Sequence, residues 1–566
     1  MKLKQIIPAL LVASLTTGAM AQNIQREVDV TRAYEPSVQN FLKLGISPDM
    51  ADTAQMRPDF QYEITPRPLR YGFSVNPINP AQFATVGGRT FYPGYAKVGL
   101  GFPMQSVADL RYVGRNTDPT KWGFFANHYG QYGKIENDLD IKESAFQTFN
   151  RGGFFVDHRL SGDLFVGGNI DYDFNKVTRY GYYSATGILP GTFDTSKDAL
   201  GQFYHDLRGQ VHIGNSFTDS GKFNFDVNLG GGYFGDRYKY DQWDVLGGFK
   251  LAFPVGYSSG LEIRGELSTT GGMKNLDGYS NTVGTAGLLF RYDDGALHIN
   301  LGGDFGYDKV KSDDQAESKG KATFLPEVLL EYVVADGVVI PFIEWKSRIE
   351  RNSFADLARI NPYVYSGISM PNTKSHQGQA GIKGTIGGSF KYRLYCGYSI
   401  LKDAYYWQNA YFDGSQGNAF FAMSDDELKV IQGGLEVEAN IVNALAISGA
   451  FKYSDYSSDG YEYAGGLPEL EGRLGLTYNY RNRLYLSAGA TFLGERHMYE
   501  YYVTGNRLTV NTLSSAVDLG LGVDYFIKKE LGVFLRVNNL LNQELYQFNR
   551  YKMLGINAQA GVMISF

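Results

Sequence analysis

The residues that could do chemistry in this chain are few and scattered. Its seven histidines show neither an H-E-x-x-H motif nor a Cys/His cluster with zinc-ligand spacing: His128, His158, His205, His212, His298, His376 and His497. No serine is marked as a nucleophile by its local sequence. We therefore expect no enzymatic activity, no metal site and no cofactor.

Two acidic runs could bind cations. They are Asp313-Asp314 and Asp425-Asp426-Glu427, and both fall in or beside expected loops. They could hold divalent ions that bridge lipopolysaccharide, or they could be ordinary solvated loop charges. The sequence favours the second interpretation, because acidic runs are usually solvated.

Aromatic side chains cluster in two segments that could contact a ligand. Tyrosine offers a flat apolar face and a hydroxyl at low entropic cost, which suits contacts with sugars or proteins. The same residues would equally suit the aromatic girdle of a membrane interface. The clusters consist of Tyr405, Tyr406, Trp407, Tyr411 and Phe412, and of Tyr499, Tyr501 and Tyr502. Phe420, Phe421 and Met423 follow the first cluster and would be costly in water, so we expect something to cover them.

The composition favours one long antiparallel β-structure. Glycine contributes 69 of the 566 residues and tyrosine 42, whereas soluble proteins contain only about 7% glycine. The 53 basic and 59 acidic residues leave a formal charge of −6 with no polybasic footprint, so we expect no nucleic-acid partner. Cys396 is the single cysteine, which excludes a disulfide scaffold.

The N-terminus has the three parts of a cleavable secretory signal. Lys2 and Lys4 precede an apolar stretch over residues 6–15, and an A-x-A cleavage site ends at Ala21. The apolar stretch is too short to cross a bilayer as a helix, which needs about 20 residues. We expect residues 1–21 to be removed on export and the mature chain to reach the outer membrane.

From about Gly94 to the C-terminus, apolar and polar residues alternate in one segment after another. Successive strand side chains point to opposite faces, so each segment has one apolar and one polar face. A soluble β-sandwich alternates as well, but polar faces rich in Asp, Asn, Arg and Gly, with aromatic residues at segment ends, favour a transmembrane barrel. Some polar-face charges could line a conduit or cross-pair within it, namely Asp171, Asp173, Arg473 and Lys452.

The alternating segments number about 22, give or take about two, and their connections alternate in length. The short connections are residues 160–163, 219–221, 293–295, 335–337, 387–389 and 481–483. The long connections are residues 180–199, 351–375, 403–426 and 494–512. Short periplasmic turns opposite long extracellular loops are typical of outer-membrane barrels. The predicted fold is therefore all-β, a transmembrane antiparallel β-barrel over residues 94–566.

The segment of residues 22–93 differs in kind. Its 72 residues contain eight prolines, against nine in residues 94–566: Pro36, Pro48, Pro58, Pro66, Pro68, Pro77, Pro80 and Pro93. Such a density forbids a regular central strand or a long helix. The segment is an irregular periplasmic arm or an insert in the barrel lumen, and the sequence leaves both open.

The C-terminal stretch of residues 531–566 resembles the last hairpin of TonB-dependent receptors. In that family, an apolar strand runs into V-x-N-L-x-N-x-x-Y, and a final strand ends in an aromatic residue. The matching residues here are Val537, Asn539, Leu540, Asn542 and Tyr546, with Phe566 at the barrel seam. The resemblance implies a 22-strand outer-membrane barrel, in agreement with the strand count.

Near the mature N-terminus, a short string resembles the family's TonB box, a strand that pairs with the energy-coupling protein TonB by β-addition. It consists of Glu27, Val28, Asp29, Val30 and Thr31, and it could equally be an ordinary extended tail. The family also carries a globular plug, for which residues 22–93 are too few, although such a wide lumen is normally plugged. The chain is therefore most similar to plug-reduced or plug-less, receptor-like barrels of Bacteroidetes.

Two functions follow as expectations. The leading one is a non-enzymatic receptor-like barrel that binds or passes a solute across the outer membrane, with TonB or a surface lipoprotein as a possible partner. The alternative is an accessory structural subunit of a larger outer-membrane assembly, in contact with other barrels. Membrane lipids and lipopolysaccharide would surround either protein. A third function, an outer-wall hydrolase, would require a Ser–His contact near a membrane interface.

Overall fold

The computed structural model describes residues 92–566, apart from residues 115–118, 137–141, 182–198, 216, 218–220, 313–319, 336, 412–417, 443 and 503–506. All the described residues belong to one compact unit. The expected signal sequence, the TonB-box-like residues 27–31 and nearly all of the Pro-rich segment lie outside the described residues.

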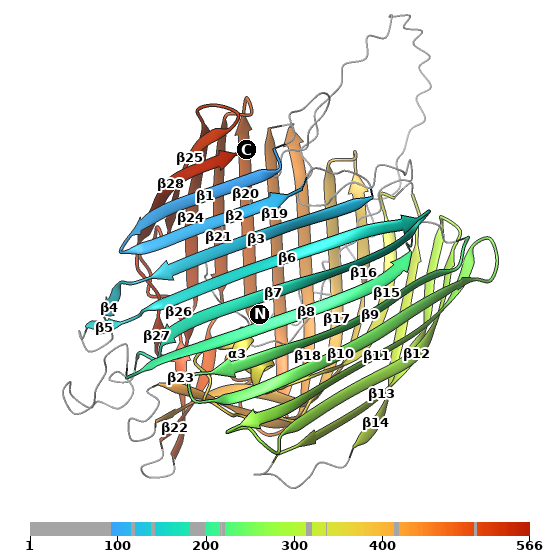
Figure 1. The fold of residues 1–566 in the computed structure, drawn as a ribbon, viewed down its shortest axis with the longest axis horizontal. Helices are drawn as coiled ribbons and strands as arrows, with labels where there is room; N and C mark the ends of the chain where they lie inside the picture. The colour runs from blue at the N-terminus through green and yellow to red at the C-terminus, as the bar shows by residue number, and fades with distance from the viewer. Residues whose placement is uncertain are drawn as a thin grey trace, which may run out of the picture. The chain divides into compact units, whose positions relative to one another are not determined.

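Twenty-two strands form one closed antiparallel barrel (Figure 1). The first eleven are β1 (Gly94–Phe102), β2 (Gln105–Val113), β3 (Thr120–Gln131), β6 (Gln147–Ser161), β7 (Leu164–Thr178), β8 (Gly201–Asn215), β9 (Asn224–Asp236), β10 (Tyr240–Pro254), β11 (Ser259–Lys274), β12 (Ser280–Asp293) and β13 (Leu297–Lys311). The other eleven are β14 (Lys321–Tyr332), β15 (Ile340–Glu350), β16 (Thr373–Ile386), β17 (Phe390–Tyr411), β18 (Ala419–Val442), β19 (Leu445–Ser458), β20 (Leu470–Tyr480), β21 (Leu484–Leu493), β24 (Ala516–Phe526), β25 (Leu531–Asn538) and β28 (Asn557–Ser565). The predicted strand number and fold class are confirmed.

The barrel closes where its last strand pairs with its first. β28 runs antiparallel to β1, with Val98 opposite Val562. At the end of this seam, Gly94 N–H donates to Phe566 O at 2.7 Å, and Phe566 N–H donates to Gly94 O at 2.9 Å. The C-terminal Phe566 therefore lies at the seam, and every wall strand has two neighbours.

The alternation along each strand separates an apolar outer face from a polar inner face. On β1, Val98, Leu100 and Phe102 are exposed on the outside, whereas Lys97, directly before Val98, is buried on the inside. Because exposed apolar side chains recur on the outer face of nearly every wall strand, the outside of the barrel matches a hydrocarbon solvent.

The turns at one end of the barrel are short and need positive φ angles. Arg481 and Asn482 both have φ of 55°, and Gly387 and Gly388 have φ of 59° and 71°. Two successive residues with positive φ match the twist of the flanking strands in tight hairpins. Gly94 and Phe566 lie at this same short-turn end.

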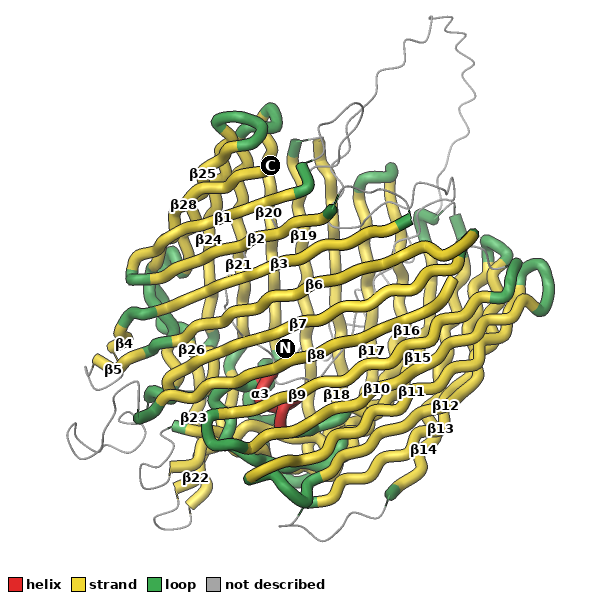
Figure 2. The backbone as a smooth tube through the Cα atoms, viewed as in Figure 1, coloured by secondary structure: helices red, strands yellow, loops and turns green. Residues whose placement is uncertain are grey.

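The opposite, long-loop end carries most of the additional secondary structure. These additional elements are β4 (Lys134–Glu136), β5 (Lys142–Ser144), α3 (Phe354–Ile360), β22 (Arg496–Tyr502), β23 (Arg507–Leu513), β26 (Tyr546–Phe548) and β27 (Tyr551–Lys552). Figure 2 shows α3, in red, inside the ring of wall strands. Among the described residues, no helix is long and apolar enough to cross a bilayer.

The long loop predicted over residues 403–426 is wrong. β17 continues to Tyr411 and β18 begins at Ala419, so most of this range is a protruding hairpin. Tyr406 and Trp407 point to opposite faces of β17, yet both are buried, in two different apolar clusters. A strand that is covered on both faces does not alternate between apolar and polar residues. The alternation therefore predicted the end of this strand too early.

Candidate functional site at the closed mouth of the barrel

The connection between β15 and β16, residues 351–372, folds into the long-loop mouth of the barrel. Its helix α3 begins after Ser353, whose Oγ accepts a hydrogen bond from Asp356 N–H, while the Asp356 carboxylate accepts one from Ser353 N–H. This reciprocal capping box satisfies two backbone donors at the helix start. Phe354 and Leu357 are fully buried, so the helix presents its apolar face to the interior of the mouth.

Charged side chains attach α3 to the inner face of the wall. Arg351 Nε and Arg359 Nη1 lie 2.8 Å and 2.9 Å from the two carboxylate oxygens of Asp356. Arg351 also lies 2.9 Å from Asp244 on β10. Arg359 donates two hydrogen bonds, of 2.7 and 2.9 Å, to Asp206 on β8. Such charge-assisted, two-pronged bonds fix orientation as well as position.

The buried carboxylate of Asp356 is held in its ionised form. Burial by itself would raise its pKa, but the positive charges of Arg351 and Arg359 outweigh burial and lower the pKa below its ordinary value. The pKa values of both arginines are raised, against the effect of burial, by Asp356 and their other acidic neighbours. The three groups therefore remain charged at neutral pH.

Uncharged hydrogen bonds extend the attachment around the wall. Gln242 on β10 accepts from Ala355 N–H at 3.1 Å, and Asn372 exchanges bonds of 2.8 and 2.9 Å with Asn281 on β12. Further bonds run from Tyr204 to Pro362 O, from Arg179 to Val364 O and from Gln202 to Ser366 Oγ. One connection thus bonds to β8, β10, β11 and β12 through side chains.

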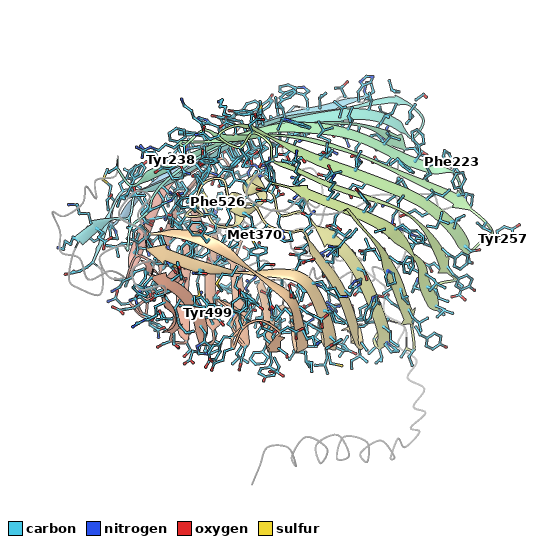
Figure 3. All side chains as sticks on the ribbon, turned by 90° about the horizontal axis from the view of Figure 1, so that it is seen from below. Phe223, Tyr238, Tyr257, Met370, Tyr499 and Phe526 are labelled. Carbon is cyan, nitrogen blue, oxygen red and sulfur yellow. The ribbon has the colours of Figure 1, made fainter. Side chains whose placement is uncertain are left out.

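An apolar core fills the mouth around this connection. It combines Phe354, Leu357, Tyr363, Val364 and Met370 with residues from other connections and from the upper parts of strands, such as Tyr180, Tyr204, Phe234, Trp407, Phe420 and Tyr551. Figure 3 places Met370 between the two sides of the wall, whereas the exposed Tyr257 lies in the turn between β10 and β11, at the short-turn end. The described parts of the long loops therefore pack on one another across the mouth.

The two aromatic clusters singled out in the sequence lie side by side. β22 pairs in parallel with the end of β17, with Gln408 opposite Tyr499 and Tyr411 opposite Tyr502. Tyr406, Trp407 and Tyr499 are buried, and Tyr405, Tyr501 and Tyr502 are half-buried. A cavity of about 10 Å³, the size of one water molecule, is lined by Tyr405 and Tyr406 of the first cluster together with Leu401, Leu428 and Leu467.

Not every aromatic residue of these clusters can be placed. Phe412 lies outside the described residues, as do Asp313 and Asp314, and only the backbone of Tyr411 is described. Phe420 is covered, as expected, by Trp407, Phe548 and Tyr551. A ligand contact by these aromatic residues stays a prediction.

The acidic run at residues 425–427 has structural partners. Asp425 is buried and accepts hydrogen bonds of 2.6 Å from both Tyr406 Oη and Ser458 Oγ, and one of 3.1 Å from Gly460 N–H. Glu427 lies 2.8 Å from Lys429. Within the described part of the chain, no group of three or more His, Cys, Asp or Glu side chains is arranged to hold a metal ion.

Charges on the inner wall cross-pair. Asp173 lies between Arg151 and Arg208, at 3.5 and 2.5 Å, and Lys452 lies 2.6 Å from Glu471. Arg264 similarly contacts Asp304 and Glu327. Of the four charges singled out in the sequence, Asp171, Asp173 and Lys452 take the paired arrangement.

The inward-folded connection is the functional feature that the sequence interpretation missed. It was expected as a long extracellular loop. Ser353 followed three residues later by Asp356 resembles the capping signature of a helix start, with an acidic residue in place of the usual Glu or Gln. That signal could have predicted α3, although not its position inside the barrel.

No protein-family model matches the chain, and no curated protein matches its sequence. Several solved structures match its fold. The FrpB iron transporter from Neisseria meningitidis has a TM-score of 0.64 at 11% identity, covering 85% of this chain and 83% of the transporter. The ferripyoverdine receptor of the outer membrane of Pseudomonas aeruginosa has a TM-score of 0.62 at 12% identity, covering 85% and 72%. The ferric enterobactin receptor PfeA of P. aeruginosa has a TM-score of 0.59 at 12% identity, covering 85% and 81%.

These matches establish the architecture. At 11 to 12% identity, they show that the chain has the closed 22-strand barrel fold of such receptors, and they carry no residue of a binding site across. The TonB-dependent receptor-like barrel implied by the C-terminal hairpin is thus confirmed at the level of the fold.

Proposed function

We propose that the protein is an outer-membrane barrel of the TonB-dependent receptor type, which binds a solute at its long-loop end and admits it when residues 351–372 withdraw. The observation that carries this proposal is how the connection is attached. Nearly all of its bonds to the wall involve side chains. Among the described residues, a single β-bridge, between Val364 and Phe420, joins it to the wall by backbone hydrogen bonds. It can therefore leave the mouth without breaking the wall ladder.

Two further features support a receptor. The lumen-facing charges and the exposed apolar outer face suit a wet channel through a membrane. The matched ferripyoverdine receptor was solved with its ferric ligand, so a ferric chelate is the first ligand class to test. The TonB-box-like residues 27–31 would then couple opening to TonB, and residues 22–93 would form the periplasmic arm or a second obstruction.

Ion conductance in planar bilayers tests the closure directly. We expect the mature chain to be nearly silent in KCl, and a variant with residues 352–371 replaced by a short Gly-Ser linker to conduct. Replacing residues 294–296 of a short turn by the same kind of linker is the matched control and should stay silent. A silent loop variant, or a wild type that conducts equally well, would contradict the proposal. Deleting residues 22–93 in the same assay asks whether that segment also obstructs the lumen.

A second function, that of an accessory subunit in an outer-membrane assembly, is favoured by the β22–β23 hairpin. In the described structure β23 pairs only with β22, so its other edge is free for a partner strand. Leu508 and Val510 on this strand are exposed. An unpaired edge with apolar side chains suits protein–protein contact.

Co-purification from the native outer membrane separates the two functions. Mild-detergent extraction of the tagged full-length chain, followed by mass spectrometry, should recover a receptor alone or with one surface lipoprotein. An accessory subunit should be recovered with other barrels in fixed amounts, and Leu508→Asp should release them. If the protein is a receptor, replacement of residues 352–371 should leave the set of co-purifying proteins unchanged.

A further inference from the structure

The outer wall of the barrel carries a hydrogen-bonded serine, histidine and asparagine. Ser106 Oγ lies 2.7 Å from His128 Nε2, and His128 Nδ1 lies 2.7 Å from Asn150 Oδ1. The residues come from three successive wall strands, β2, β3 and β6, and each is 22 positions after the one before it in the sequence. No local motif could reveal this contact, because strand pairing creates it.

All three side chains lie on the lipid-facing side of the wall. Residues directly opposite each other in a ladder share a face. Leu100 is opposite Ser106, Ala108 is opposite His128, and His128 is opposite Asn150. Leu100 is 74% exposed on the outside of β1, so the whole row faces outward.

The hydrogen bonds fix the protonation pattern that a general base requires. Asn150 Nδ2 donates to Phe174 O at 2.9 Å, so Asn150 Oδ1 is the atom that faces the imidazole. His128 Nδ1 must therefore donate its proton to Asn150. The lone pair on Nε2 then points at the Ser106 hydroxyl, as in serine hydrolases whose histidine is oriented by a third residue.

The cluster lies where a membrane ends. β1 and β2 have nine residues each, which is about the minimum of 9–11 for a tilted transmembrane strand. Ser106 is the second residue of β2, next to the turn at the long-loop end. Phe102 ends β1 and Met104 lies in that turn, and they are 81% and 68% exposed, as expected of apolar side chains at a membrane surface. Polar groups facing lipid are costly unless they are hydrogen-bonded, and these three bond to one another.

A tyrosine hydroxyl lies beside the serine, and space for an acyl chain adjoins the histidine and the asparagine. Gly130 is opposite Ser106, and a Cβ there would lie 2.7 Å from Ser106 Oγ and would collide with the Tyr132 hydroxyl. The glycine thus leaves room for Tyr132 Oη, which lies 3.1 Å from Ser106 Oγ. A groove of about 540 Å³ runs from His128 and Asn150 along small and apolar outer residues, including Val98, Ala108, Leu110, Ala126, Gly152 and Phe174. Its volume falls within the range of small-molecule ligand sites, and its apolar lining suits an acyl chain.

We propose that Ser106, His128 and Asn150 hydrolyse carboxylic esters of long acyl chains at the outer surface of the membrane. Ser106 Oγ attacks the ester carbonyl while His128 Nε2 accepts the hydroxyl proton, and Tyr132 Oη donates to the developing oxyanion. Collapse of the tetrahedral intermediate expels the alcohol, which receives the proton from His128. Water, activated by His128, then cleaves the acyl–Ser106 ester and releases the free acid. Asn150 is a positioning residue. The inference shares only the membrane location with the proposed function.

A fluorophosphonate probe tests the site, because an activated serine displaces its fluoride and keeps the phosphonyl group. We expect the full mature chain, folded in detergent, to be modified at Ser106, as read from the mass of its peptide. Ser106→Ala and His128→Ala should each lose modification by roughly 10³-fold or more. Thr120→Ala is the matched control, and its loss should change nothing. Thr120 Oγ1 lies 2.7 Å from His158 Nδ1 on the same outer face, with no third residue bonded to that histidine in the described part of the chain. Heat-modifiable mobility on gels verifies that each variant is folded.

Release of fatty acid identifies the substrate. The wild-type protein should release fatty acid from vesicles of phosphatidylethanolamine or from vesicles containing lipopolysaccharide. The vesicle type from which acid is released identifies the lipid that supplies the ester. Asn150→Ala should lose most activity, whereas Asn150→Asp should retain it and move the pH profile. An unmodified Ser106, labelling that survives His128→Ala, or no acid release from either vesicle would each overturn the proposal.

Discussion

Asp356 is the side chain on which the closure of the mouth most directly depends. It caps α3 and at the same time lies between two arginines that reach the acidic residues of two wall strands. A buried charge of this kind is tolerated only when it is paired, because desolvation of an unpaired ion is costly. Removal of one partner therefore affects the whole attachment.

Asp356→Asn should loosen residues 351–372 by about 3–5 kcal/mol, because Arg351 and Arg359 would lose their shared buried counter-charge. Hydrogen exchange of peptides from this segment measures the change. Asp163→Asn, at an exposed short turn, is the matched control and should leave exchange unaltered. Unchanged protection in Asp356→Asn would show that the pairing does not hold the segment.

Acid should open the mouth only at low pH. The pKa of Asp356 in the fold lies below its ordinary value, which in an unfolded chain is about 3.9. Its ionised form therefore contributes full stability above about pH 4, and this contribution is lost as pH falls through the lowered folded value. Conductance should be flat from about pH 8 to 5 and should rise below about pH 4. A rise already near neutral pH would exclude Asp356 as its cause.

At the scale of elements, α3 is a helix that only its surroundings can stabilise. Its seven residues are too few for an isolated helix, because the cost of nucleation is not recovered in two turns. The capping box and the burial of Phe354 between Phe234 and Tyr240 compensate for this cost. The helix therefore forms with the closed mouth and is expected to be lost with it.

Phe354→Ala should destabilise the closed mouth by about 3–5 kcal/mol, since it removes a fully buried ring and leaves a cavity. Protease sensitivity within residues 351–372 is the measurement, together with conductance. Phe305→Ala removes the same ring from the outer wall, where it is 70% exposed, and should not affect either. Heat-modifiable mobility should show a folded barrel in both variants. If Phe354→Ala remained as protected as wild type, α3 would not depend on this contact.

At the scale of the whole molecule, closure of the wall removes every edge strand except those of the small hairpins. Backbone groups cannot remain unpaired in hydrocarbon, so a membrane β-sheet must close on itself. The β1–β28 pairing does this, and the exchange of hydrogen bonds between Gly94 and Phe566 extends the seam to its last residue.

Deletion of Phe566 should lower the resistance of the barrel to heat, because two seam hydrogen bonds worth about 1 kcal/mol each would be lost. The temperature of the gel-mobility shift gives the effect. Phe566→Leu keeps the backbone bonds and should lie close to wild type. Equal losses in both variants would assign the effect to the ring instead of the seam.

The sequence by itself determined the features that depend on the local alternation of apolar and polar residues. Alternation over residues such as 556–566 defines an outer and an inner face, and short turns such as 387–389 and 481–483 join strands that must pair antiparallel. These two local properties were sufficient for the fold class, the strand number and the end that bears long loops. They failed at Tyr406 and Trp407, where burial on both faces of β17 removes the alternation.

Only the tertiary structure decided where the long loops go and which polar residues meet. Arg359 and Asp206 are 153 residues apart, and Ser106, His128 and Asn150 lie on three strands. A local pattern carries the orientation of a side chain relative to its own strand, but it carries no information about its neighbour across a ladder or a lumen. Those contacts depend on the register and closure of the entire barrel, because a shift of one residue would turn every side chain to the other face.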